Sequence, residues 1–193
     1  MKYLKTALVL CLIALFCSAA IAGVNMLTEQ TIINNANAAK EETIKSIFAD
    51  YDKVASGDPL SLEGRDSAIV EVILAKNSAN EELGYLYTAT GKNAYGPITI
   101  MVAIVNDTVY QVEFLENGQS FASTVVEHVK GNYPSSKEEK IIISFYTKDD
   151  EYIEISALDE ASLNAINTKC GATFGANTVK ELVLIALNDE RGA

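Results

Sequence analysis

The start of the chain differs sharply from the rest in its pattern of hydrophobic and polar positions. Residues 7–24 read ALVLCLIALFCSAAIAGV, a run of 18 residues in which Ser18 is the one weakly polar member. About 20 apolar residues are needed to cross a bilayer, and apolar neighbours on both sides extend the run to residues 4–27. This segment therefore predicts a membrane-spanning helix.

The flanking charges predict an orientation for that helix. Lys2 and Lys5 precede the apolar run and Glu29 follows it, which places the N-terminus in the cytoplasm and the remaining chain outside the cytoplasmic membrane. A cleaved signal peptide is the alternative, because the small residues of Ala20-Ile21-Ala22 resemble a cleavage site. We favour an uncleaved anchor, because the run is longer than the about 7–15 apolar residues of a signal peptide core.

The segment after the anchor predicts a polar helix followed by a loop. From Thr28 to about Asp50, apolar residues recur near helical spacing without an interrupting proline or glycine. We expect this helix to continue from the membrane segment as a stalk. Val54–Arg65 contains two glycines and a proline, and therefore predicts a loop.

The next part of the chain has the patterns that are typical of strands. Leu83–Thr90 and Thr108–Leu115 alternate between apolar and polar residues, whereas Pro97–Val105 is continuously apolar, as expected for a strand covered on both faces. Asn106-Asp107 lies between two of these runs and predicts a tight hairpin turn. Further strands are expected at residues 68–75, 140–147 and 152–155.

Two helices complete the pattern, and together the elements predict an α+β fold with an antiparallel meander. One helix is expected at residues 119–131 and the other from Asn177, as its N-cap, to about Asn188. The predicted organisation has three parts: a cytoplasmic N-terminus and transmembrane anchor (1–27), a stalk helix and loop (28–65), and one soluble domain (66–193).

Charge and cysteine content narrow the possible functions. The net charge is −11, and the residues after the apolar run carry all 26 acids but only 13 of the 15 bases. Such a domain repels nucleic acid and anionic lipid surfaces. Cys170 is the one cysteine outside the apolar run and His128 is the one histidine, so neither a disulfide framework nor a metal site is indicated. We interpret His128 as a residue on a helix surface.

One short segment carries candidate chemistry. Residues 170–177 read CGATFGAN, two glycines among small residues, and they lead directly into an amphipathic helix. Glycine allows a ligand to approach the backbone, and the free N–H groups at a helix start favour phosphate. Thr173 adds a hydroxyl to the same segment. Taken alone, the pattern favours an ordinary glycine-containing turn before a helix, because a short glycine motif is a weak signal.

Cys170-Gly171-Ala172-Thr173, followed by a helix, resembles the FMN-binding subunits of the Rnf and Na+-translocating NADH:quinone reductase complexes. In that family, the threonine of the pattern Asp-x-x-[Ser/Thr]-Gly-Ala-Thr is esterified to FMN through its phosphate. The N-terminal anchor and the segment Gly84–Glu116 are also similar to the family, and the chain length suits the Rnf G subunit.

The resemblance implies a function and a set of partners. It implies a membrane-anchored electron carrier with FMN bound covalently to Thr173, with Cys170, Gly171 and Ala172 forming the rest of the cofactor-binding loop. Residues 66–193 would then be the FMN-binding domain. The protein would act with the other subunits of an ion-translocating electron-transport complex rather than as an enzyme alone, and a flavin transferase would modify it.

Three differences from the family keep an alternative open. Asn167 stands where the motif has Asp, and Cys170 stands where it has Ser or Thr. Glu116–Ala122 reads ENGQSFA where the family has a His-Glu-Thr-Pro-Gly-like segment beside the flavin. The alternative is an exported, non-redox binding or interaction module with the same fold.

Overall fold

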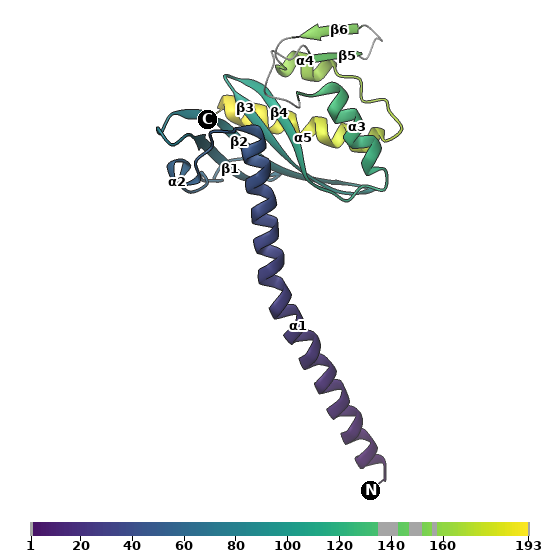
Figure 1. Cartoon of the computed structure of the whole chain (residues 1–193). Coiled ribbons are helices and arrows are strands. Elements are labelled where there is room, and N and C mark those ends of the chain that lie inside the picture. Colours follow the sequence, from purple (N-terminus) through teal and green to yellow (C-terminus); the bar gives the residue numbers. More distant parts are fainter. Residues whose placement is uncertain (1, 135–142, 147–151, 156–157, 193) are drawn as a thin grey trace. The chain divides into compact units, whose positions relative to one another are not determined.

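The computed structural model describes residues 2–134, 143–146, 152–155 and 158–192, and divides the chain into two compact units, Met1–Glu42 and Thr43–Ala193 (Figure 1). The helices are α1 (Lys2–Ile47), α2 (Lys53–Ser56), α3 (Ala122–Asn132), α4 (Glu160–Ala165) and α5 (Thr173–Gly192). The strands are β1 (Ile69–Lys76), β2 (Glu82–Asn93), β3 (Gly96–Val105), β4 (Thr108–Asn117), β5 (Ile143–Tyr146) and β6 (Tyr152–Ile155).

Helix α1 joins the apolar run and the expected stalk helix without a break, as the sequence predicts. Its hydropathy and length suit a membrane span, with a mean hydropathy of 2.7 in its most apolar part, and none of that part is buried within the chain. Only the last residues of α1 belong to the second unit, where Ile44 and Ile47 are buried.

The second unit is built on a four-stranded antiparallel sheet with the order β1-β2-β3-β4, so the predicted α+β meander is confirmed. The turn between β3 and β4 has positive φ at both Asn106 (51°) and Asp107 (59°). Positive φ at both central residues is the requirement of the tight hairpin turn that the sequence predicts there. Strands β5 and β6 form a separate two-stranded sheet.

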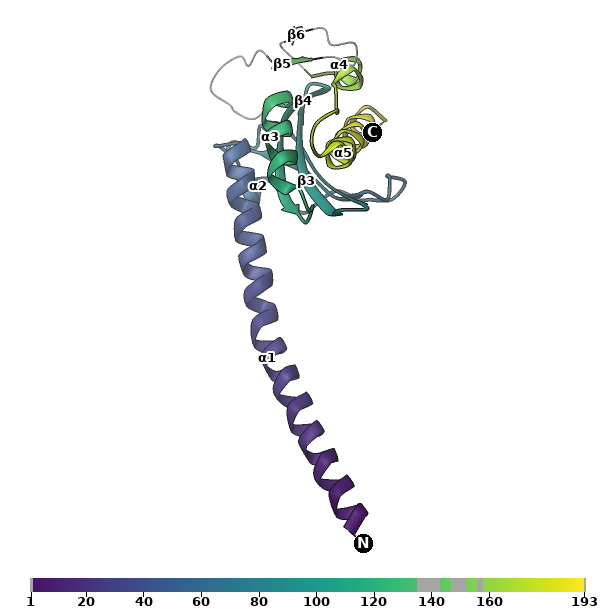
Figure 2. The same ribbon diagram turned by 90° about the vertical axis from the view of Figure 1, so that its right-hand side faces the viewer.

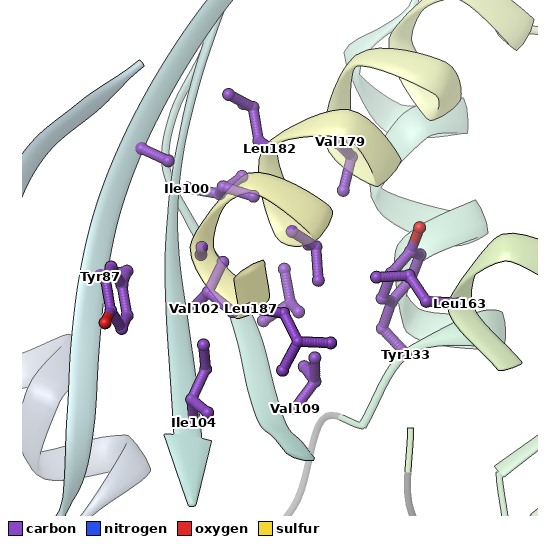
Figure 3. Packing of buried hydrophobic residues seen from close by; sticks show 14 of the residues in the cluster. Tyr87, Ile100, Val102, Ile104, Val109, Tyr133, Leu163, Val179, Leu182 and Leu187 are labelled. Atoms are coloured by element: carbon purple, nitrogen blue, oxygen red, sulfur yellow. The ribbon is translucent and has the colours of Figure 1, made fainter. Parts of the chain in front are cut away.

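Both faces of the four-stranded sheet are covered, which explains the unbroken apolar run of β3. Ile100, Val102 and Ile104 point to the face that α5 covers, whereas Met101 and Ala103 pack with Ile47 and its neighbours on the other face. All five of these β3 side chains are fully buried. Figure 2 shows the sheet nearly edge-on with α5 on one side of it, and Figure 3 shows β3 side chains pointing toward Leu182 and Leu187 of α5.

Two expectations about helices are wrong in detail, and one helix was missed. Helix α5 begins at Thr173 rather than at Asn177, so Asn177 lies inside the helix and is not its N-cap. The expected loop after the stalk contains α2, whose N-cap Asp52 accepts hydrogen bonds from the amides of Val54 and Ala55. Helix α4 was not expected at all, although its N-cap Asp159 accepts a hydrogen bond from the Ser162 amide at 2.8 Å.

Candidate functional site

The loop at residues 170–172, which was expected to bind the cofactor, leads directly into α5 in the second unit. Residues 170–172 precede the helix, and Thr173 is its first residue. The first helical hydrogen bond runs from the amide of Ala176 to the carbonyl of Ala172 at 3.0 Å. The amides of residues 173–175 therefore precede the first amide that donates within the helix, and negative charge is favourable at this end.

Thr173 is the residue on which a phosphoester is expected, and it lines a pocket. Its side chain is half-buried, and Oγ1 donates a hydrogen bond to the carbonyl of Cys170 at 2.8 Å. This hydrogen bond fixes the rotamer of Thr173 and leaves the lone pairs of Oγ1 free to meet an electrophile.

The volume of this pocket is about 240 Å³. Residues 171–175 form one side of the pocket, and Tyr95, Gln119 and Phe121 form the other. These three residues come from the β2–β3 turn and from the β4–α3 loop. The structure therefore brings together Gly171, Ala172 and Thr173 of the expected site, while Cys170 lies just outside the pocket lining.

Three exposed aromatic side chains surround the pocket. Tyr95, Phe121 and Phe174 are 43%, 54% and 60% exposed. The ring centroid of Tyr95 lies 5.6 Å from that of Phe174 and 6.2 Å from that of Phe121. Exposed apolar groups gathered around a concavity indicate a binding surface, and a planar ring system could pack against them.

Glycines permit the close approach of the segments that form the pocket. Gly96 has a φ of +137°, and a Cβ atom there would lie 2.1 Å from the carbonyl oxygen of Gly118. The turn and the loop are held together by Gln119, whose side-chain amide donates to the carbonyl of Gly96, and by the amide of Ser120, which donates to the carbonyl of Tyr95 at 3.2 Å. Gln119 is itself buried, at 7% exposure.

Both residues that differ from the family motif take part in hydrogen bonds within the loop. Asn167 Oδ1 accepts a hydrogen bond from the amide of Lys169 at 2.9 Å, and an aspartate oxygen can accept the same bond. Cys170 contributes its backbone carbonyl to Thr173, so its side chain is not needed for that contact.

Two other threonines lie near the loop, and their hydroxyls donate hydrogen bonds as that of Thr173 does. Thr168 Oγ1 donates to Asn177 Oδ1 at 2.6 Å. Thr178 is buried inside α5 rather than in its first turn, and its hydroxyl donates to the carbonyl of Phe174 at 2.9 Å. Neither residue lines the pocket.

The aromatic residues of the pocket were missed as site residues in the sequence. Phe121 falls within the helix expected at residues 119–131, but it lies at the N-cap of α3 and is exposed. The difference from the family at residues 116–122 could have indicated this part of the site, because that segment supplies Gln119 and Phe121 to the pocket.

His128 does not belong to the pocket and is not a plain surface residue. It is half-buried on α3, and burial lowers the pKa of its imidazole below the usual value. Within the described ranges, no group of three or more histidine, cysteine or acidic side chains could hold a metal ion. The acidic pairs Glu138-Glu139 and Asp149-Asp150, which we interpret as solvated loops, lie outside the described residues.

Comparison with known proteins gives a match at the N-terminus. Residues 2–47 match the model of the RnfG N-terminal region, a range that equals helix α1. None of the curated proteins compared with the chain matches it significantly. The match and the long apolar helix support a membrane-anchored subunit of an Rnf-type complex. The chain thus resembles the RnfG subunit, on the evidence of its N-terminal region.

Proposed function

We propose that the protein is a membrane-anchored flavoprotein electron carrier, with FMN attached through its phosphate to Thr173. The observation that carries this proposal is the position of the Thr173 hydroxyl, at the start of a long helix and on the wall of a pocket surrounded by aromatic side chains. The RnfG match over residues 2–47 supports the other part of the proposal, a membrane-anchored subunit of an Rnf-type complex.

The residues around the pocket fit the parts of FMN. The amides of residues 173–175 and the positive end of the α5 dipole suit a phosphate ester on Thr173. Tyr95, Phe121 and Phe174 offer apolar surface to a planar ring. FMN, when bound, supplies reversible electron transfer, while these residues supply attachment, position and shielding from water.

A covalent link suits the location that we propose. We propose a cytoplasmic N-terminus and anchor at residues 1–27, a stalk and loop at residues 28–65, and an FMN-binding domain outside the cytoplasmic membrane at residues 66–193. The lysines that precede the apolar run support this orientation. A dissociable flavin would be lost there, whereas an ester bond retains it. A flavin transferase would form the bond, and other subunits of an ion-translocating Rnf-type complex would exchange electrons with the domain.

A second function is favoured by the size of the pocket. About 240 Å³ is below the roughly 300–1,000 Å³ that is typical of small-molecule sites, and the exposed aromatic residues could instead contact another protein. On this alternative, the domain is an exported, non-redox interaction module.

Flavin fluorescence on a denaturing gel separates the two functions. The full chain is produced together with a flavin transferase, extracted from the membrane and compared with Thr173→Ala. A matched control is Thr124→Val, which removes a hydroxyl from α3, next to the loop, where Thr124 Cγ2 lies 3.5 Å from the Cβ position of Gly171. The electron-carrier proposal expects a fluorescent band in the wild type and in Thr124→Val but not in Thr173→Ala. A colourless wild-type band favours the interaction module.

A further inference from the structure

A buried lysine in α5 contacts the segment that leads into the Thr173 loop. Lys180 is 8% exposed, and its Nζ donates hydrogen bonds to the carbonyls of Asn164 at 2.8 Å and Ile166 at 3.3 Å. Asn164 lies in the last turn of α4, and Ile166 is the C-cap of that helix. Carbonyls at a helix C-terminus carry partial negative charge, so they suit a buried ammonium group.

Asn177 makes a second contact with the same segment. It lies three residues before Lys180, so the two side chains project from one face of α5. Asn177 Oδ1 accepts the hydrogen bond from Thr168 Oγ1 at 2.6 Å. Helix α5 thus holds the chain at residues 164, 166 and 168, immediately before the loop.

These contacts restrict residues 169–172, the span that contains the Cys170 carbonyl to which the Thr173 hydroxyl donates its hydrogen bond. Residues 169–172 connect the last held residue, Thr168, to Thr173, where α5 begins. A short span with both ends fixed has few conformations. If one end were released, the span would become more flexible, and ordering it during modification or ligand binding would cost more conformational entropy. There is space beside Gly171, since a Cβ atom there would meet Thr124 at an ordinary 3.5 Å.

We propose that Lys180 is a positioning residue that, with Asn177, holds residues 164–168 against α5 and so presents the Thr173 hydroxyl to the pocket. This inference rests on the proposed function for its consequence, the attachment of flavin to Thr173, but the holding of the loop can be measured without any flavin. Lys180 acts through the loop and does not line the pocket.

The test is hydrogen exchange of the unmodified full chain in detergent. Lys180→Met keeps the length of the side chain and removes the ammonium group, and Lys169→Met removes an exposed lysine of the same loop as a matched control. We expect amides in residues 167–172 to exchange at least about tenfold faster in Lys180→Met than in the wild type, with β2 and β3 unchanged. Lys169→Met should match the wild type.

Thr168→Val is the second variant, because a buried lysine replacement can destabilise the whole domain. It cuts the other contact at a half-buried position and should accelerate exchange in the same residues. If β2 and β3 also exchange faster in Lys180→Met, that variant has destabilised the whole domain. Exchange of residues 167–172 in Thr168→Val then shows whether α5 holds the loop. Unchanged exchange in residues 167–172 in Thr168→Val, together with unchanged or only global acceleration in Lys180→Met, overturns the proposal.

Kinetics of the flavin transferase connect the held loop to function. With Lys180→Met as the acceptor protein, the KM should rise about tenfold while kcat changes less than twofold, because a mobile loop costs entropy on binding. A lower kcat with unchanged KM contradicts the positioning role. If the wild type accepts no flavin, the proposed function fails, while the exchange measurement still decides whether Lys180 holds the loop.

Discussion

Gly175 offers a quantitative test of how the site is built. It is buried in the first turn of α5, and a Cβ atom there would lie 2.4 Å from Val125 Cγ2 on α3 and 3.3 Å from Gln119 Oε1. Gly175→Ala therefore forces α5 and α3 apart. Overpacking of this kind costs about 1–3 kcal/mol, and alanine recovers up to about 1 kcal/mol through its higher helix propensity. We expect the free energy of unfolding to fall by about 1–2 kcal/mol.

Urea denaturation of a double-mutant cycle measures this effect. Val125→Ala removes the methyl group that clashes, so the double variant should be more stable than the sum of the single changes by about 1 kcal/mol or more. Flavin attachment to Thr173 should decrease in Gly175→Ala and recover in the double variant, since the first turn returns to its place. The reasoning is refuted if Gly175→Ala stabilises the domain or if the two changes are additive.

The remaining predictions concern stability and the loop. Asp159→Ala should lower the free energy of unfolding by about 1 kcal/mol, because it removes the N-cap hydrogen bond from the Ser162 amide. Hydrogen bonds from Ser162 lower the pKa of Asp159 in the folded protein, so this contribution should disappear as the pH falls below about 4. Burial lowers the pKa of His128 in the folded protein, so the unfolded chain binds the proton more readily. The urea midpoint of unfolding should therefore fall as the pH drops below about 6.5, and His128→Gln should remove this pH dependence. Asn167→Asp keeps the acceptor for the Lys169 amide, so stability should stay within about 0.5 kcal/mol and flavin attachment should equal or exceed that of the wild type, as mass spectrometry can show.

The sheet could be predicted from the sequence because its signals are local. The unbroken apolar run from Pro97 to Val105 indicates a strand buried on both faces, and the structure buries it between α5 and the end of α1. Asn106-Asp107 tolerates positive φ, so the hairpin turn could be predicted from two residues.

The beginning of α5 could not be predicted, because tertiary packing decides it. Gly175 reads as a loop residue, since glycine is unfavourable inside a helix. In the structure its missing side chain is what allows α5 to pack against Val125, so the helix extends back to Thr173. The local pattern instead placed the helix start at Asn177.

The pocket also could not be predicted from local patterns in the sequence. Its aromatic residues come from three segments that are far apart in the sequence, and none of the segments shows a pattern that separates a binding residue from a core residue. Phe121 fits the apolar spacing of α3, yet it lies at the exposed N-cap. The loop itself was found through Thr173 and its resemblance to a known motif, and the structure adds the surface opposite it.

The central claim is that the Thr173 hydroxyl carries FMN, and peptide mass mapping of the full chain tests it most directly. The chain is produced with a flavin transferase and digested, and fragments covering residues 167–180 are sequenced by mass spectrometry. We predict that the mass added by an FMN phosphoester lies on Thr173 and disappears in Thr173→Ala. An FMN mass on Thr168 or Thr178 that persists in Thr173→Ala, or an unmodified fragment in the wild type, would contradict this account.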